Sequence, residues 1–413
     1  MRQFLFLLCF SICIQLFSGC KNSYQREITD VLSRIQKKYA PDSRIALFDV
    51  KINRDHRLAV EGETNLISAF NELDSIMRED YPKVDFRVKL LPSESLDSLI
   101  RGIITVSVAN LRLTPGHSAE LVTQAILGTP VKVIKKEGNW YLIQTPDSYL
   151  GWMTKSSIFL RTEKGISNYN HSNRIIFNDL TGTCYTLPDK DSQPVSDLVA
   201  GSILKIIDSE RGFWKVQFPD GRSGYVNQNQ CKPYEEWMEL CIRNYKSITI
   251  NQEEIIKTAM KFIGLPYLWG GTSSKGVDCS GFTKTVFFMN GIILQRDASQ
   301  QVLYGYLIDT HNNYDKLEPA DLLFFGTHET DSTSEKVTHV GICIGNGEII
   351  HSSSGAGLVK INSLVPGREN YNGYLDSIFI RTRRILTCVG QPGIEPVFSN
   401  ELYSPSGKDI KME

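Results

Sequence analysis

A cysteine and two histidines in the last third of the chain have types and a spacing suited to nucleophilic catalysis. Cys279 stands between Asp278 and Ser280, and the apolar stretch after them stops at Asn290-Gly291, a pair typical of a helix C-terminus. We therefore expect a helix that begins at or near Cys279. The partial positive charge at a helix N-terminus favours a thiolate, which is one half of an activated nucleophile.

The two histidines lie on one predicted β-hairpin. Residues 337–344 alternate as a strand, residues 345–347 (GNG) turn the chain, and residues 348–351 return. An isolated cysteine is more often a small buried hydrophobe, and an isolated strand histidine is more often structural. The chain has only seven histidines, however, and two of them, His339 and His351, share this hairpin downstream of the cysteine.

The register of the hairpin decides whether the two histidines can meet. A two-residue turn would pair His351 with Ile342, and His339 would then face the other way. A three-residue loop would pair His351 with Gly341 and make His339 a diagonal neighbour on the same face. We expect the three-residue loop or an equivalent bulge. His339 would then take the proton of the Cys279 thiol, and His351 would orient and polarise His339.

Six motifs in the last block of the chain, residues 245–390, resemble those of the NlpC-type cysteine peptidases. In chain order they are 266–271 (PYLWGG), 278–282 (DCSGF), 296–297 (RD), 319–325 (PADLLFF), 339–342 (HVGI) and 350–351 (IH). The resemblance implies a papain-like α+β fold and cleavage of bacterial wall peptides. It also implies that Cys279 is the nucleophile, His339 the general base and then acid, His351 the orienting residue, and Tyr267 a donor to the oxyanion.

An internal repeat precedes this block. Gly128, Gly138-Asn139-Trp140 and Gly151-Trp152 recur at an offset of 73 or 74 residues as Gly201, Gly212-Phe213-Trp214 and Gly224-Tyr225. Each copy consists of short alternating strands between turn residues, which predicts a small β-barrel. The landmarks resemble those of bacterial SH3-like domains, and we place the copies at residues 103–162 and 175–234.

Two SH3-like domains ahead of an NlpC-type domain resemble the γ-D-glutamyl-L-diamino acid endopeptidases, also called dipeptidyl-peptidase VI. These enzymes release L-Ala-γ-D-Glu from wall peptides with a free N-terminal alanine. An ammonium at the blind end of a cleft needs a carboxylate. Asp278 is one candidate, and the resemblance adds Glu120 and Tyr149 from the first SH3-like domain, although each would otherwise be an ordinary loop residue.

The same resemblance implies contacts to the D-glutamyl unit. It assigns them to Ser280, to Asp297 and to the backbone at Ala298, which replaces an expected hydroxyl residue. Trp269 would form a wall of the cleft or serve packing alone. Two alternatives remain: a D,L-endopeptidase that acts on intact peptidoglycan, and a non-catalytic adaptor that binds the wall. The presence of the cysteine and both histidines argues against the adaptor.

The N-terminus has the pattern of an export signal. A basic start and the apolar run that follows predict a secretory signal over residues 1–19. Phe17-Ser18-Gly19-Cys20 resembles a bacterial lipoprotein cleavage site, although Phe17 stands where leucine is usual. We therefore expect a lipid-anchored protein with Cys20 acylated, facing the periplasm of a Gram-negative-type bacterium. The next segment, residues 20–100, predicts the order α-β-β-α-β and resembles the small BON domain.

Composition argues against several other kinds of partner and cofactor. The 413-residue chain has 45 Lys and Arg against 46 Asp and Glu, and this balance argues against a nucleic-acid partner. No CxxC pair occurs, and no metal or organic cofactor is implied. In an exported protein Cys184 and Cys231 could form one disulfide. The tail, residues 391–413, contains Pro, Ser and Gly and is expected to be loosely ordered.

Overall fold

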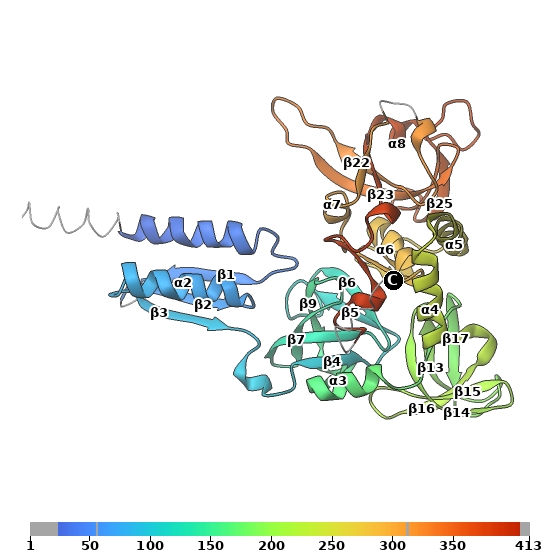
Figure 1. Ribbon diagram of the computed structural model, residues 1–413, viewed down its shortest axis with the longest axis horizontal. Coiled ribbons are helices and arrows are strands. Elements are labelled where there is room, and N and C mark those ends of the chain that lie inside the picture. Colours follow the sequence, from blue (N-terminus) through green and yellow to red (C-terminus); the bar gives the residue numbers. More distant parts are fainter. Residues whose placement is uncertain (1–23, 55–56, 311–313, 405–413) are drawn as a thin grey trace, which may run out of the picture. The chain divides into compact units, whose positions relative to one another are not determined.

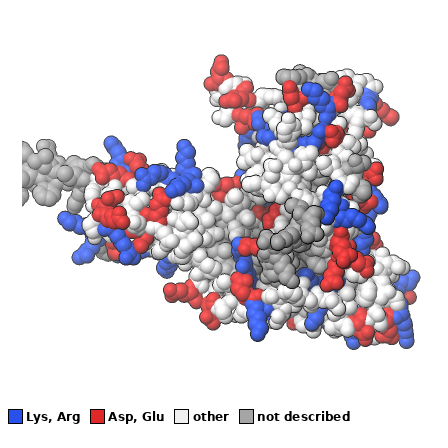
Figure 2. Space-filling view, in the orientation of Figure 1, with Lys and Arg blue, Asp and Glu red and all other residues white. Residues whose placement is uncertain are grey.

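The structure is a computed structural model that describes residues 24–54, 57–310 and 314–404 (Figure 1). The chain divides into two compact units, one up to Asp97 and one from Ser98 onward, which are described separately below. The predicted signal segment and Cys20 lie outside the described residues. No helix in the described ranges is both long and apolar enough to cross a membrane. Acidic and basic side chains are both scattered over the face drawn in Figure 2.

The N-terminal unit is a small mixed α/β layer. After a helix over residues 24–39 come β1 (Phe48–Asn53), β2 (Ala59–Thr64), α2 (Ile67–Asp80) and β3 (Asp85–Leu90). The predicted order α-β-β-α-β is confirmed. β1 and β2 pair antiparallel, whereas β2 and β3 pair parallel with α2 as their crossover. The helices cover this sheet with buried side chains such as Ile28, Ile35 and Leu73. The BON resemblance stays a prediction.

Two seven-stranded sheets follow, and they have the same topology. The first contains β4 (Arg101–Ile104), β5 (Val108–Arg112), β6 (Leu121–Ile126), β7 (Pro130–Glu137), β8 (Trp140–Gln144), β9 (Leu150–Thr154) and β10 (Ile158–Arg161). The second contains β11 (Arg174–Phe177), β12 (Thr181–Tyr185), β13 (Pro194–Val199), β14 (Ile203–Glu210), β15 (Phe213–Gln217), β16 (Ser223–Asn227) and β17 (Cys231–Pro233). Their orders are β10-β4-β7-β8-β9-β5-β6 and β17-β11-β14-β15-β16-β12-β13, so each strand matches the one seven places earlier. The strand order therefore repeats as the sequence repeat predicted.

The disulfide considered for the second barrel is not formed. Cys184 lies in the barrel core and Cys231 packs against that core, but both carry free thiols. Burial raises the pKa of each thiol to about 12. Disulfide formation proceeds through a thiolate, so this apolar surrounding opposes it.

The remaining residues form an α+β domain around a six-stranded antiparallel sheet. Its strand order is β21-β26-β22-β23-β24-β25, built from β21 (Tyr306–Ile308), β22 (Leu322–Thr327), β23 (Lys336–Gly345), β24 (Glu348–Ser353), β25 (Leu358–Ser363) and β26 (Phe379–Arg384). The helices are α3 (Glu163–Asn170) between the barrels, then α4 (Tyr234–Tyr245), α5 (Ile248–Lys261), α6 (Cys279–Met289), α7 (Ala298–Gln301) and α8 (Gly373–Ser377). Two short pairs are added, β18 (Thr272–Ser273) with β19 (Gly276–Val277), and β20 (Ile292–Leu294) with β27 (Ile394–Pro396). α6 packs its apolar residues against the sheet, as Phe282 and Val286 do against Phe324 and Val340 in one buried core.

The C-terminal segment is ordered as far as residue 404, contrary to the expectation of a loose tail. β27 pairs with β20, and the side chains of Val397, Leu402 and Tyr403 are buried. The carbonyl of Leu402 also accepts a hydrogen bond of 2.8 Å from Nδ2 of Asn170 in α3. The prediction failed because these apolar residues are too few and too widely spaced to give a periodic pattern.

Candidate active site

The nucleophile candidate begins a helix, as predicted. α6 starts at Cys279, and Asp278 is its N-cap, with Oδ1 accepting a 2.7 Å hydrogen bond from the backbone N–H of Gly281. Aspartate is a favoured N-cap because its carboxylate satisfies an N–H that lacks an intrahelical partner. The helix ends at Asn290-Gly291, where Gly291 has a φ of 81° that favours glycine. The Cys279 side chain is 8 % exposed.

The Cys279 side chain is a neutral thiol and not the thiolate that its place at a helix N-terminus led us to expect. Burial, reinforced by the nearby Asp278 carboxylate, raises its pKa to about 12. The backbone N–H groups of Val340 and Ser280 and the Arg296 guanidinium oppose this rise but do not outweigh it. A helix N-terminus alone therefore does not make a thiolate here, because desolvation favours the neutral form more strongly. The resting side chain is a thiol that needs a base.

The predicted histidine pair is formed. β23 and β24 are joined by a two-residue turn at Asn346-Gly347, and a bulge between Cys343 and Gly345 shifts the register so that Ile342 pairs with Ile350. Continuing that register places His351 opposite Gly341, the pairing expected from a loop or an equivalent bulge. The two rings meet, with 2.7 Å between Nε2 of His339 and Nδ1 of His351. The bulge supplies the extra residue that this pairing requires.

A third polar residue, Asn362 on β25, extends this pair and was not predicted. Its Oδ1 lies 3.1 Å from Nε2 of His351, while its Nδ2 donates a 3.0 Å hydrogen bond to the carbonyl of Asn370. Since Nδ2 is the donor, Oδ1 must accept, so His351 carries its proton on Nε2. Nδ1 of His351 then accepts from Nε2 of His339, which leaves Nδ1 of His339 as the basic atom. Sequence reasoning missed this contact because it depends on the pairing of Lys360 with His351, which places Asn362, two residues further on, on the same face of the sheet.

Both imidazoles are held neutral. Burial, together with the neighbouring His351 ring, lowers the pKa of His339 to about 3. Burial also lowers the pKa of His351 to about 4, against the hydrogen bond to Asn362, which opposes the shift. A neutral histidine is the form that can accept a proton from a thiol.

Cys279 and the histidines share one cleft. Two cavities of about 490 and 540 Å³ have Tyr267, Trp269, Cys279 and Thr338 in both of their linings. The histidines line the larger cavity only. The backbone N–H of Val340, the residue after His339, donates toward the Cys279 sulfur, which places the histidine strand against the nucleophile.

Tyr267 lies at the point where the two cavities meet. Burial, with Cys279 and Asp278 nearby, raises the pKa of its phenol to about 12. The phenol therefore stays protonated and can donate a hydrogen bond. Its role as a donor to the oxyanion stays a prediction, and the structure places it beside Cys279 in the linings of both cavities.

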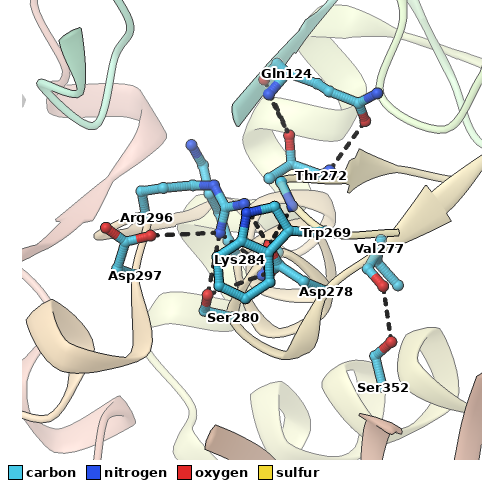
Figure 3. Close-up of polar contacts among 12 residues, drawn as sticks. Gln124, Trp269, Thr272, Val277, Asp278, Ser280, Lys284, Arg296, Asp297 and Ser352 are labelled. Atoms are coloured by element: carbon cyan, nitrogen blue, oxygen red, sulfur yellow. Dashed lines mark hydrogen bonds and ion pairs between the residues drawn. The ribbon is translucent and has the colours of Figure 1, made fainter. Parts of the chain in front are cut away.

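The carboxylate of Asp278 lines the smaller cavity and is at the same time bound by several donors of the protein. Besides capping α6, it forms a buried ion pair with Arg296 (2.5 Å between Oδ2 and Nη2) and accepts from the backbone of Gly270 at 3.0 Å (Figure 3). Ser280 joins the same network, because its Oγ donates to Asp278 and accepts a 3.1 Å bond from Arg296. The sequence identified Arg296 only as part of a family motif. In the structure it neutralises the carboxylate next to Cys279. Asp278 thus has a structural role, and its predicted contact to a terminal ammonium stays a prediction.

The first barrel supplies the far wall of the smaller cavity. Glu120 and Tyr149 both line it, together with Asp297 and Ala298 at the start of α7. Oε1 of Glu120 accepts a 2.9 Å hydrogen bond from the indole N–H of Trp269, whose side chain is 64 % exposed and so forms a wall and not a core contact. The Tyr149 hydroxyl donates a 3.1 Å hydrogen bond to Oδ2 of Asp297. The predicted substrate residues are therefore brought together around one cavity.

A short hairpin ties the nucleophile to both barrels. Thr272 and Ser273 bond to the backbone and side chain of Gln124 in the first barrel, with Thr272 N–H donating to Gln124 Oε1 at 3.0 Å (Figure 3). Ser274, two residues on, bonds to the Leu180 carbonyl and the Ala200 N–H in the second barrel. The hairpin leads directly into Asp278-Cys279, so both barrels are bonded to the segment that precedes the sulfur.

Comparison with known proteins agrees with this geometry. The model of the NlpC/P60 family matches residues 264–378, and that of the bacterial SH3 domain matches residues 107–158. The chain carries an NlpC/P60 cysteine-peptidase domain. That domain contains the cysteine, both histidines and the tyrosine described above. Within the described residues, no group of three or more His, Cys, Asp or Glu side chains is arranged to hold a metal ion.

Similar proteins match the chain over a longer stretch than the NlpC/P60 domain alone. The chain is 29 % identical over 267 residues to the γ-D-glutamyl-L-lysine dipeptidyl-peptidase of Bacillus cereus, covering 62 % of this chain and 75 % of that one. It is also 29 % identical over 273 residues to dipeptidyl-peptidase 6 of Lysinibacillus sphaericus, covering 64 % and 92 %. A crystal structure of an NlpC/P60 family protein from Bacillus cereus superposes with a TM-score of 0.55 and 25 % identity, over 69 % of this chain and 99 % of that one. The chain thus carries an NlpC/P60 peptidase domain and resembles these dipeptidyl-peptidases over more than half of its length.

Proposed function

We propose that this NlpC/P60 peptidase cleaves the γ-D-Glu–L-diamino acid bond of peptidoglycan fragments with a free N-terminal L-Ala. The observation that carries the proposal is that Glu120 and Tyr149 of the first barrel line the smaller cavity together with Cys279. Glu120 provides a carboxylate at the wall, where the terminal ammonium of a dipeptide unit would end. A carboxylate in this position favours a peptide with a free N-terminal ammonium over one whose N-terminus is linked to glycan.

The chemistry would pass through a thioacyl enzyme. Nδ1 of His339 takes the proton of the Cys279 thiol while the sulfur attacks the γ-carbonyl carbon of D-Glu. The carbonyl oxygen becomes an oxyanion, to which the Tyr267 phenol donates. His339 then returns the proton to the leaving amine as the C–N bond breaks. A water molecule, deprotonated by His339, attacks the thioester, and the thiol is restored as L-Ala-γ-D-Glu leaves.

The histidine chain prepares His339 for both proton transfers. Asn362 fixes the tautomer of His351, and His351 in turn fixes that of His339, as derived above. We assign the D-glutamyl unit to Ser280, to Asp297 and to the backbone at Ala298, because all three line the smaller cavity beside the sulfur.

The decisive test uses L-Ala-γ-D-Glu-L-Lys and its N-acetylated form, with products identified by mass spectrometry. Free peptide should yield L-Ala-γ-D-Glu and lysine, whereas the acetylated peptide should resist cleavage because it lacks the ammonium. Equal cleavage of both would favour a D,L-endopeptidase on intact peptidoglycan instead. Cys279→Ser serves as the inactive control. Glu120→Gln should lower kcat/KM on the free peptide by about ten- to a hundredfold, since a charge-assisted hydrogen bond is lost.

We also propose that the protein is exported and anchored by lipid at Cys20. The support is the sequence at residues 1–20. Full-length protein should partition into detergent and incorporate labelled palmitate in a bacterial host, and Cys20→Ala should abolish both. Equal partition and labelling of the two proteins would contradict the anchor.

A further inference from the structure

The two cavities of the cleft differ in the charges that line them. The smaller cavity is lined by charges of both signs, and the proposed function assigns the N-terminal dipeptide unit to it; its charged residues are Glu120, Asp278, Asp297, Arg296 and Lys336. The larger cavity begins at the same Cys279 sulfur and extends past the histidines. A peptide held with its dipeptide unit in the first cavity must therefore place its leaving group in the second.

Among the described residues, the larger cavity has one side chain with a permanent charge, and it is a cation. Lys360 lines it on β25, opposite His351 in the strand pairing. The other members of the lining are neutral polar, apolar or aromatic residues such as Ser353, Asn372 and Tyr374. Lys360 forms no ion pair with any other described residue. Its positive charge reaches the catalytic pair, because it contributes to the lowered pKa of His351.

A lone ammonium in a cavity of about 540 Å³ favours an anionic ligand group. The leaving diamino acid can carry a carboxylate at two positions. One is its own α-carboxylate, present whenever it ends the peptide. The other is a second carboxylate at the end of the side chain, present in diaminopimelate and absent from lysine. A side chain that ends in an ammonium only would meet a like charge here and no carboxylate among the described lining residues.

We propose that Lys360 is a specificity-determining residue that binds a carboxylate of the released diamino acid. The proposal rests on the proposed function, because that function decides which cavity receives the leaving group. It predicts that the enzyme selects its substrates at both ends, by an ammonium at one and by a carboxylate at the other.

Four tripeptides L-Ala-γ-D-Glu-X separate the possible carboxylates. X is L-Lys, L-lysinamide, meso-diaminopimelate, or meso-diaminopimelate amidated at the carboxyl next to the cleaved bond. We expect kcat/KM for at least one carboxylate-bearing peptide to exceed that for the lysinamide peptide by about ten- to a hundredfold. A preference for L-Lys over lysinamide would assign the α-carboxylate. Full activity on the amidated diaminopimelate peptide would assign the side-chain carboxylate.

Variants then connect this preference to Lys360. The ratio to follow is kcat/KM for the preferred carboxylate-bearing peptide divided by kcat/KM for the lysinamide peptide. Lys360→Met should reduce this ratio to near one, and Lys360→Arg should keep it. Lys336→Met, which removes a lysine from the smaller cavity, should keep the ratio as well. The proposal is overturned if wild-type protein cleaves all four peptides equally, or if Lys360→Met slows all four by the same factor. If wild-type protein cleaves none of the four peptides, that result contradicts the proposed function instead.

Discussion

At the scale of single residues, the site depends on a neutral thiol and a neutral imidazole and not on a preformed ion pair. Burial raises the pKa of Cys279 to about 12 and lowers that of His339 to about 3, so both shifts favour the uncharged pair. The direction of proton transfer is then set by hydrogen bonds. Asn362, through His351, leaves the acceptor lone pair of His339 on Nδ1. Asn362, which also lines the larger cavity, thus decides which ring atom of His339 can accept a proton.

The variant Asn362→Leu tests this chain of hydrogen bonds. Without the acceptor, Nε2 of His351 loses its partner, so the ring can adopt the tautomer that donates to His339 from Nδ1. We expect kcat to fall by about ten- to a hundredfold. KM should change less than kcat, because Asn362 lines only the larger cavity and the lining of the smaller one keeps all its residues. Asn362→Asp keeps an acceptor, and its negative charge favours protonated His351, so the acid limb of the kcat/KM profile should move to higher pH. An Asn362→Leu enzyme with wild-type kcat would show that the tautomer is set elsewhere.

The buried histidines also make stability depend on pH. Their folded-state pKa values, about 3 and 4, lie below the unfolded value of about 6.5, so the unfolded chain binds more protons between pH 6.5 and pH 4. Their contribution is complete above pH 6.5 and is lost as the pH falls toward 4. Each histidine should add a slope of up to about 1.4 kcal/mol per pH unit to the free energy of unfolding.

Denaturant titrations of wild type and His351→Gln between pH 7 and pH 4.5 measure this slope. The variant should show the shallower dependence, since one of the two buried imidazoles is gone. His328→Gln, at an exposed position, is the matched control and should retain the wild-type slope. Parallel curves for wild type and His351→Gln would contradict the assignment of a buried neutral ring.

At the scale of elements, the sequence predicted the features that depend on neighbouring residues, such as helix ends and turns. It did not predict contacts between residues that are far apart in the chain. α6 could be placed because an Asp N-cap and an Asn-Gly end bracket an apolar stretch. The hairpin register could be reduced to two options by its Gly-rich turn. The pairing of Asp278 with Arg296 could not be foreseen, because a carboxylate beside a nucleophile has the same sequence whether it faces substrate or a buried guanidinium. Asn362 was missed for a similar reason, since only the order of the sheet brings β25 beside the histidines.

The loop before β9 shows how one element positions another. Asp147, which is 1 % exposed, forms a 2.5 Å ion pair with Lys284 in α6 and accepts a 2.6 Å hydrogen bond from Thr145. The same loop carries Tyr149, whose hydroxyl bonds to Asp297. The ion pair therefore joins the wall of the smaller cavity to the helix that begins at Cys279.

Removing one partner of this ion pair should be costly. Lys284→Met leaves a buried carboxylate without its cation, and we expect a loss of about 3–5 kcal/mol in the free energy of unfolding of this unit. Adding Asp147→Asn to it should recover part of that loss, because the uncompensated charge disappears. The two single variants and the double variant form a cycle that chemical denaturation can measure. Additive losses would show that the two side chains do not interact.

At the scale of the whole molecule, the catalytic sulfur lies where three domains meet. The hairpin of β18 and β19 bonds to Gln124 in the first barrel and, through Ser274, to the second barrel. A further bond, 2.7 Å from Ser352 Oγ to the Val277 carbonyl, fixes the strand of His351 to the same hairpin (Figure 3). The barrels are thus part of the active site in two ways: the first supplies wall residues, and both hold the segment that leads into Cys279.

The variant Gln124→Leu separates these two roles. It removes the hydrogen bonds from Thr272 N–H and Ser273 Oγ to the Gln124 side chain while leaving Glu120 and Tyr149 in the sequence. We expect KM for a free-amine tripeptide to rise by at least about fivefold, since the barrel wall is held less tightly. The rate at which iodoacetamide alkylates Cys279 should change less than twofold, because the thiol keeps its own surroundings. Ser274→Ala, which loosens the second barrel instead, should leave KM nearer the wild-type value. If Gln124→Leu slows alkylation as much as it impairs peptide cleavage, the first barrel acts on the nucleophile itself and not on recognition of the N-terminal unit.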